Sequence, residues 1–238
     1  MPAVFFLSDY GLVDEFVGVV HAVLQRLAPG VPVVDLTHQV PSFDVAAAAR
    51  VLERAAPHLG AGVVLAVVDP GVGSERRGVA IEVGSEVGPR WMVGPDNGLL
   101  LPAARLLGGP RRALSLGRAS TFDGRDVFAP AAAHLVAAGA PEDLGAPIAV
   151  DSLVGLAQDA SEASVSVSAG VLSTSVIWVD RFGNVQLAGG RSSWEQAGVV
   201  LGSRATIELG ASPGDGPGGE QSVPPSGHHV RARRVSAY

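Results

Sequence analysis

GVVLAVVDPGVGSERRG, residues 62–78, contains the most strand-like run of the chain and ends that run in an acidic residue. The run is apolar and rich in valine, which is typical of a strand covered on both faces. Asp69 ends the run, a glycine-rich turn comes next, and Arg76 and Arg77 follow the turn. The glycines lack the G-x-G-x-x-G spacing of a dinucleotide-binding loop. We expect a buried strand whose terminal carboxylate is held ionised by an arginine that folds back on it, and the alternative is that Arg76 and Arg77 are ordinary surface cations.

Apolar runs alternate with helical patterns on both sides of this strand. Further strands are predicted at residues 3–9, 31–38, 78–83 and 90–98, and helices at 14–30, 43–60 and 126–139. Asp44 is placed to cap the second of these helices. The alternation predicts an α/β domain with a mostly parallel central sheet.

The character of the sequence changes near residue 150. We predict an N-terminal domain over residues 1–150, a small and polar linker over 151–168, and a β domain over 169–238. The β domain has strand-like runs at 174–180, 184–189 and 204–209, and residues 210–229 are dominated by glycine and proline, which predicts a flexible loop. The chain resumes strand character only briefly after this loop, so we expect the second domain to be shortened or incomplete.

Composition excludes several classes of function. The chain has no cysteine, which excludes disulfides and thiolate chemistry, and all 17 basic residues are arginine, which excludes a Schiff base. Its net charge is −6 and its one basic cluster is VRARR near the end, so a nucleic-acid partner is not expected. No apolar stretch is long enough for a membrane span, and the N-terminus has the pattern of a strand and not of a signal peptide. A cytoplasmic protein is expected.

Four predicted strand ends carry polar residues. Asp9, Asp35 with His38, Asp69, and Asp96 each follow a strand. Ligands of open α/β sheets bind at the carboxyl ends of strands, so one cleft lined with carboxylates is a plausible arrangement. Asp-Pro-Gly and Asp-Asn-Gly also form ordinary turns, and the same acids with His38 are suitable ligands for a hard metal ion.

Two further motifs also allow both a structural and a functional interpretation. In STFDGRDVFAP, residues 120–130, Asp126 is interpreted as a helix cap with Arg125 as its ion partner. In VDRFGNVQL, residues 179–187, an acid, an aromatic ring and an amide surround a glycine turn. This second set is suited to recognising a purine or a sugar, and it equally suits a simple hairpin.

Taken in order, SDYG, DLTHQVPSFDV, VVDPGVGSERR, GPDNGLL, TFDGRDVFAPAAAHL and VDRFGNVQL resemble the S-adenosyl-L-methionine (SAM) hydroxide adenosyltransferase family, which is related to fluorinases and chlorinases. The resemblance covers residues 4–190 and implies an α/β domain followed by a smaller β-barrel-like domain. It implies hydrolysis of SAM to adenosine and methionine by attack of water or hydroxide at ribose C5′. It also implies a homotrimer with active sites between subunits, and no cofactor or catalytic metal.

The resemblance also assigns roles to residues. Asp69 and Arg76 match two members of a catalytic Asp-Arg-His set, and Asp123 stands where the third member, histidine, is expected. The implied substrate-binding residues are Asp9, Phe43, Thr121, Phe122 and Gly124, together with Asp180, Phe182 and Asn184 from the neighbouring subunit. Asp9 would hold the ribose hydroxyls, and Phe182 would stack on the substrate.

Asp123 and the C-terminus depart from the family pattern. A second carboxylate beside Arg76 disfavours hydroxide nearby, so we expect slower hydrolysis and an altered pH profile, and a faster enzyme when Asp123 is replaced by histidine. The resemblance also implies further C-terminal strands that contact the methionine and adenine, and the sequence ends at Tyr238 before the residues expected there. These departures leave a catalytically impaired SAM- or nucleoside-binding protein as the alternative. A SAM-dependent halogenase is less favoured, because the Asp69 carboxylate repels halide.

Overall fold

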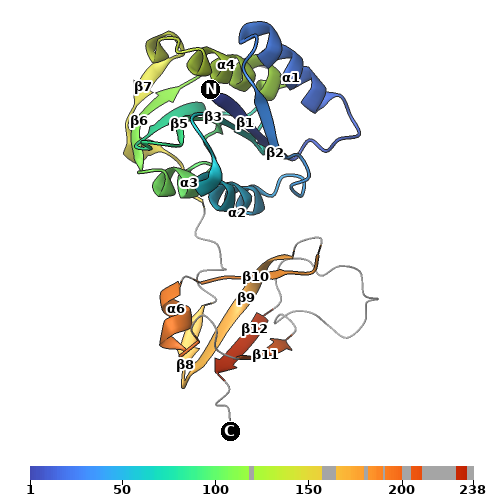
Figure 1. Ribbon diagram of the computed structural model, residues 1–238, viewed down its shortest axis with the longest axis vertical. Helices are drawn as coiled ribbons and strands as arrows, with labels where there is room; N and C mark the ends of the chain where they lie inside the picture. Colours follow the sequence, from blue (N-terminus) through green and yellow to red (C-terminus); the bar gives the residue numbers. More distant parts are fainter. Residues whose placement is uncertain are drawn as a thin grey trace. The chain divides into compact units, whose positions relative to one another are not determined.

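The computed structural model describes residues 1–117, 121–156, 165–179, 182–189, 191–199, 205–210 and 229–234 (Figure 1). The chain divides into two compact units, Met1–Ala157 and Gln158–Tyr238, and each is considered by itself. The division falls inside the predicted linker, of which residues 157–164 lie outside the described residues. The start of that linker is tied to the first unit, because the Val154 N–H donates to Asp96 Oδ1 at 2.9 Å.

The first unit is built on a seven-stranded sheet with the order β2-β1-β3-β5-β4-β6-β7. The strands are β1 Ala3–Ser8, β2 Val33–Thr37, β3 Gly62–Val67, β4 Gly78–Val83, β5 Pro89–Pro95, β6 Pro110–Ser115 and β7 Ala146–Ile148. β2, β1, β3 and β5 are parallel, and β4, β6 and β7 pair antiparallel. The short connection from β4 to β5 permits only an antiparallel pair. The α/β prediction is confirmed, with a sheet that is mixed beyond β5.

Helices cover both faces of this sheet. α1 (Phe16–Leu27) and α4 (Ala129–Val136) lie together on one face, while α2 (Val45–Ala55) and α3 (Leu101–Leu106) lie on the other (Figure 1). β1 and β3 are buried between the two layers, as the apolar run at 62–68 predicted. Asp44 caps α2 as expected, since its Oδ1 accepts from the Ala47 N–H at 2.8 Å.

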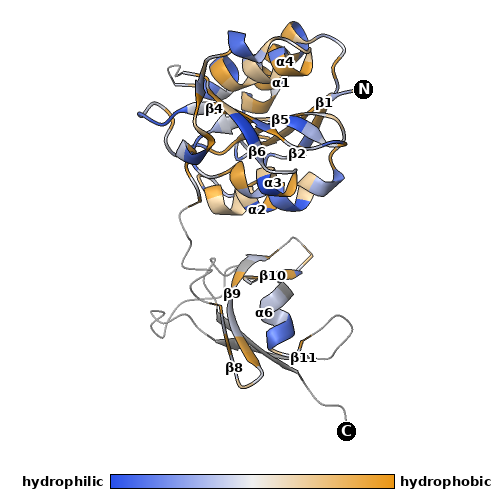
Figure 2. Ribbon diagram, turned by 90° about the vertical axis from the view of Figure 1, so that its left-hand side faces the viewer, coloured by the Kyte–Doolittle hydropathy of each residue, from blue (hydrophilic) through white to orange (hydrophobic). Residues whose placement is uncertain are grey.

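Short helical turns complete the unit: η1 Ala56–His58, η2 Gly124–Phe128, η3 Pro141–Asp143 and η4 Val150–Ser152. Sequence patterns predicted neither α3 nor β6. α3 is only six residues long, and β6 begins with two consecutive arginines after Pro110, visible as a blue strand in Figure 2. Both are too short or too polar for a periodic signal.

The second unit is an antiparallel sheet with the order β10-β9-β12-β11, and β8 also pairs with β9. Its elements are β8 Ser166–Ser168, β9 Val171–Val179, β10 Val185–Leu187, α6 Arg191–Gln196, β11 Ala205–Gly210 and β12 His229–Arg234. The three predicted strands correspond to β9, β10 and β11. β12 pairs with both β9 and β11, so the segment after the predicted loop completes the sheet. Residues 211–228 of that loop lie outside the described residues.

None of the helices in the described parts of the chain has the length and apolar character needed to cross a bilayer.

Candidate active site

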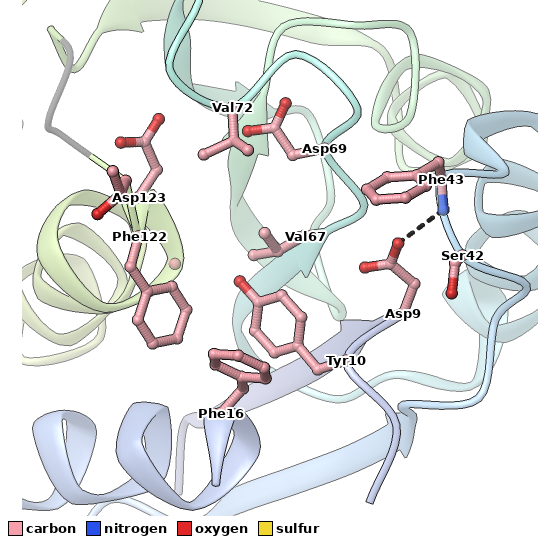
Figure 3. A pocket seen from close by; sticks show the side chains of 12 residues that line it. Asp9, Tyr10, Phe16, Ser42, Phe43, Val67, Asp69, Val72, Phe122 and Asp123 are labelled. Carbon is pink, nitrogen blue, oxygen red and sulfur yellow. Dashed lines mark hydrogen bonds between the residues drawn. The ribbon is translucent and has the colours of Figure 1, made fainter. Parts of the chain in front are cut away.

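A pocket of about 410 Å³ opens beside the ends of β1 and β3 (Figure 3). The residues after these strands supply Asp9 and Asp69, and the turn that leads into η2 supplies Asp123. Aromatic side chains form much of the remaining wall: Tyr10, Phe16, Phe43 and Phe122. The pocket therefore combines three carboxylates with an apolar, aromatic lining, which is the usual character of a small-molecule site.

Arg76 joins two of the three carboxylates. Its Nε donates to Asp69 Oδ1 at 3.0 Å, and its Nη2 donates both to Asp69 Oδ2 and, at 2.6 Å, to Asp123 Oδ2. The side chains are buried, with exposed fractions of 9% for Arg76, 7% for Asp69 and 4% for Asp123. The predicted pairing of Asp69 with Arg76 is present, and Asp123 belongs to the same ionic cluster.

The turn after β3 is folded so that Arg76 returns to Asp69. Ser74 Oγ donates to the Gly71 carbonyl at 2.6 Å and accepts from the Arg76 N–H at 3.2 Å. The Gly71 N–H donates to Asp69 Oδ1 at 3.1 Å. Gly73 has a φ of 78°, a conformation that favours glycine. Side-chain and backbone bonds within the turn thus fix both partners of the ion pair.

Asp123 stands at the start of an unusual helical turn. η2 (Gly124–Phe128) has the wide π-helical form and continues directly into α4. Such turns are often found at functional sites, where they redirect side chains. Arg125 and Asp126 lie within this turn and pair with each other at 2.6 Å, as predicted, although Asp126 does not cap the helix.

The two carboxylates of the cluster differ in their hydrogen-bond partners. Burial raises the pKa of Asp69, the negative charge of Asp123 adds to the rise, and Arg76 opposes it. Both Asp69 oxygens accept hydrogen bonds, whereas buried Asp123 Oδ1 and Arg76 Nη1 have no hydrogen-bond partner among the residues that the structure describes. Asp123 is therefore the carboxylate with an acceptor position left for a further hydrogen bond.

The aromatic wall is tightly interlocked. The Tyr10 ring centroid lies 5.8 Å from that of Phe16 and 5.7 Å from that of Phe122, and Phe16 and Phe122 are 5.4 Å apart. Burial and the surrounding carboxylates raise the pKa of Tyr10, so its hydroxyl stays protonated. A Cβ on Gly124 would clash with that hydroxyl oxygen, so a larger residue here would have to displace the Tyr10 side chain. Gly124 thus allows Tyr10 to line the pocket.

Asp9 is held by the loop after β2. Its Oδ2 accepts from the Phe43 N–H at 2.8 Å (Figure 3). Phe43 has a φ of 65°, a strained conformation for a residue with a side chain, and the residue is 65% exposed and lines the pocket. The backbone strain therefore accompanies an aromatic ring presented to the pocket and a fixed Asp9 carboxylate.

Seven predicted site residues line the pocket: Asp9, Phe43, Asp69, Thr121, Phe122, Asp123 and Gly124. Arg76 joins them through its carboxylate partners. Phe182 and Asn184 lie in the second unit, where the Phe182 ring is 75% exposed, and Asp180 lies outside the described residues. Their predicted roles are not tested by the first unit alone.

The expectation of one cleft lined by four strand-end acids is only half right. Asp96 does not line the pocket, because its carboxylate binds Arg77 at 2.6 Å and the Val154 N–H. Asp35 instead contacts two histidines. Sequence reasoning also missed Tyr10 and Phe16 as lining residues. The position of Tyr10 directly after Asp9, at a strand end, is the signal that could have identified it.

Comparisons with known proteins agree on one family. The sequence profile of the SAM hydroxide adenosyltransferase N-terminal domain matches residues 4–145. The chain is 47% identical over 203 residues to a protein named (R)-S-adenosyl-L-methionine hydrolase from Salinispora tropica, covering 82% of this chain and 74% of the relative.

Two more distant matches also cover most of the chain. A fluorinase from an Actinoplanes species is 26% identical over 226 residues, covering 83% of this chain and 75% of the relative. The crystal structure of an uncharacterized conserved protein from Thermotoga maritima matches with a TM-score of 0.73 and 30% identity, covering 87% of this chain and 79% of that one. The chain belongs to the SAM hydroxide adenosyltransferase family.

Proposed function

We propose that the protein hydrolyses SAM to adenosine and L-methionine. The observation that carries the proposal is the buried guanidinium of Arg76, bound by Asp69 and Asp123 in the wall of an aromatic pocket. The name of the 47% identical relative supports the same reaction.

The proposed reaction is a displacement at ribose C5′. A water oxygen forms the C5′–O bond as the C5′–S bond breaks, and the bonding pair returns to sulfur to give neutral methionine. The sulfonium is already a good leaving group, so the protein has mainly to position the water and accept its proton. Asp123 Oδ1 has the free acceptor position, while Arg76 stabilises hydroxide character and Asp69 orients Arg76.

The other pocket residues suit the nucleoside. Asp9 has one carboxylate oxygen held by Phe43, which orients the other for the ribose hydroxyls. Thr121, Phe122 and Gly124 line the C5′ end beside Asp123, and the Phe43 ring lies against the sugar or adenine. The aromatic wall excludes bulk water from the reacting carbon.

Assembly and environment are part of the proposal. A homotrimer would complete each pocket with Asp180, Phe182 and Asn184 of a neighbouring subunit, as the family resemblance implies. A cytoplasmic location and a reaction without cofactor or catalytic metal complete the proposal.

The test is incubation with SAM in ¹⁸O-labelled water, with and without chloride, followed by chromatography and mass spectrometry. Adenosine labelled at the 5′ oxygen, at a rate independent of chloride, is the expected result. Saturable SAM binding without product would instead identify an impaired binding protein, which the crowding of two carboxylates around Arg76 favours as the second candidate. Chloride-dependent formation of a halogenated nucleoside would refute hydrolysis.

A further inference from the structure

Three side chains outside the pocket form a compact group of nitrogen and oxygen ligands. His21 lies on α1, Asp35 on β2, and His38 directly after β2. Asp35 Oδ1 is 2.8 Å from His21 Nε2 and 3.1 Å from His38 Nε2, and the ligand atoms all lie within 4.8 Å of one another. We propose that this His-Asp-His cluster binds one divalent transition-metal ion of the zinc class.

The environment of His38 is the observation that points to a bound metal ion. Its side chain is only 2% exposed, and its Nε2 has no hydrogen-bond partner in the part of the chain that the structure describes. The Asp35 oxygen is near but does not lie in the direction of a ring N–H bond. A buried nitrogen without a partner is costly, and a metal ion in the cluster satisfies it.

The other ring nitrogen of His38 is held in place. Its Nδ1 lies 2.8 Å from the hydroxyl of buried Ser8. With the proton on Nδ1 donated to Ser8, Nε2 keeps its lone pair available for a metal ion, which is the state that metal-binding histidines use. The Phe6 ring, with its centroid 4.5 Å from that of His38, packs against the imidazole. Ser8 is thus the outer partner that orients the ligand.

The backbone brings the ligands together through a bulge. Phe6 pairs with Asp35 and Leu7 with Thr37, so Leu36 is an extra residue in β2. A bulge changes the direction of the side chains beside it, and here it lies between Asp35 and His38. The Gly11 N–H donates to the His38 carbonyl at 2.7 Å, which anchors the end of the bulged segment.

The chemistry of the set selects the ion. Two imidazoles and one carboxylate suit zinc, cobalt, nickel or ferrous iron better than magnesium or calcium. Ligand atoms around such an ion are about 3.0–3.4 Å apart when the bonds are about 2.1 Å. The separations of 2.8 and 3.1 Å from Asp35 need only a small widening, and the two histidine nitrogens, which lie within 4.8 Å of each other, have to approach to the same range. His21 and Asp35 are partly exposed, which leaves access for water as a further ligand.

The test uses the full untagged chain after dialysis against EDTA. Titration calorimetry with Zn²⁺, and the visible absorption of Co²⁺, are expected to show one ion per chain and a higher melting temperature with metal. His21→Ala and Asp35→Asn should abolish this uptake, and Ser8→Ala should weaken it by roughly 10–100-fold. Circular dichroism checks that each variant is folded.

Matched controls separate this site from nonspecific metal binding elsewhere on the chain. His58→Ala removes an exposed histidine outside the cluster and should leave the affinity unchanged, as should replacement of the adjacent histidines 228 and 229. The inference is refuted if the wild-type chain takes up no metal, because the cluster is then only a hydrogen-bonded network. It is also refuted if folded His21→Ala and Asp35→Asn bind as the wild type does. The outcome does not depend on SAM turnover.

Discussion

Replacing Asp123 with histidine is expected to accelerate SAM hydrolysis at neutral pH. Asp69 and Asp123 contact the same nitrogen of Arg76. The contacting carboxylate oxygens are therefore within about 5 Å, and at an effective dielectric constant of about 20 two charges at that distance repel by about 3 kcal/mol. A hydroxide forming beside both carboxylates meets repulsion of the same kind.

The size of the expected gain in kcat depends on how much of this repulsion the positive charge of Arg76 offsets. Arg76 remains bound to Asp69 in the variant and already compensates much of the charge, so we expect a gain of roughly 1–2 kcal/mol, or about five- to thirtyfold in kcat. Histidine also brings a base whose ordinary pKa of about 6.5 is closer to neutral pH than that of a carboxyl group.

The assay is the chromatographic rate of adenosine formation between acidic and alkaline pH. Asp123→Asn is the matched control, since it keeps a polar contact with Arg76 but has no base, and kcat should fall by about 10²–10⁴-fold. Because burial raises the pKa of Asp69, the wild-type rate should begin to fall above the ordinary carboxyl range as pH decreases. In Asp123→His the acid limb should move toward the pKa of histidine. A lower kcat for Asp123→His, at unchanged KM, would show that this position requires a carboxylate and not simply a base, and would refute the reasoning.

Three further substitutions test the site and its support. Arg76→Met leaves two buried carboxylates without a counter-charge and should cost about 3–5 kcal/mol of unfolding free energy in urea, and less as pH falls and Asp69, whose pKa is raised by burial, takes up a proton. Arg125→Met removes only an exposed ion pair and should lower the unfolding free energy far less. Gly124→Ala places a methyl against the Tyr10 hydroxyl and should raise KM for SAM and cost about 1–3 kcal/mol, and adding Tyr10→Phe should restore much of both; no rescue would show that the clash lies elsewhere. Asp96→Asn weakens a structural anchor and should lower unfolding free energy by about 1–3 kcal/mol while kcat of the folded enzyme stays unchanged; a large loss of kcat would place Asp96 in catalysis.

The features that sequence predicted are those encoded locally. The valine-rich run that ends at Asp69 has a strand pattern, and the turn that returns Arg76 to it lies within eight residues. Asp123 could be assigned to the same cluster only through the family resemblance, because 47 residues separate it from Arg76. Nothing in its local pattern indicates which strand end it meets.

Strand ends alone did not decide which acids share a pocket. Asp9 and Asp69 follow adjacent parallel strands, β1 and β3, and meet at one edge. Asp96 follows β5, where the sheet changes to antiparallel pairing, and Arg77, directly before β4, binds its carboxylate. Asp35 lies beside the bulge at Leu36, and its carboxylate contacts the two histidines instead of the pocket. Local irregularities of the sheet therefore decide which strand-end acids line the pocket, and the hydrophobic periodicity of the sequence does not reveal them.

In the proposed reaction, the charge of the cluster favours water over halide as the nucleophile. With both carboxyls ionised, Asp69, Arg76 and Asp123 carry a net charge of −1, which complements the positive sulfonium of SAM. When water attacks, the positive charge leaves sulfur and reappears on the proton that the water gives up, and Asp123 can take that proton, so the cluster faces one positive charge throughout. When a halide attacks, its negative charge cancels that of the sulfonium and no proton is released, so the carboxylates repel the nucleophile and gain nothing in return. The same two acids that slow hydroxide formation therefore favour water over halide as the nucleophile.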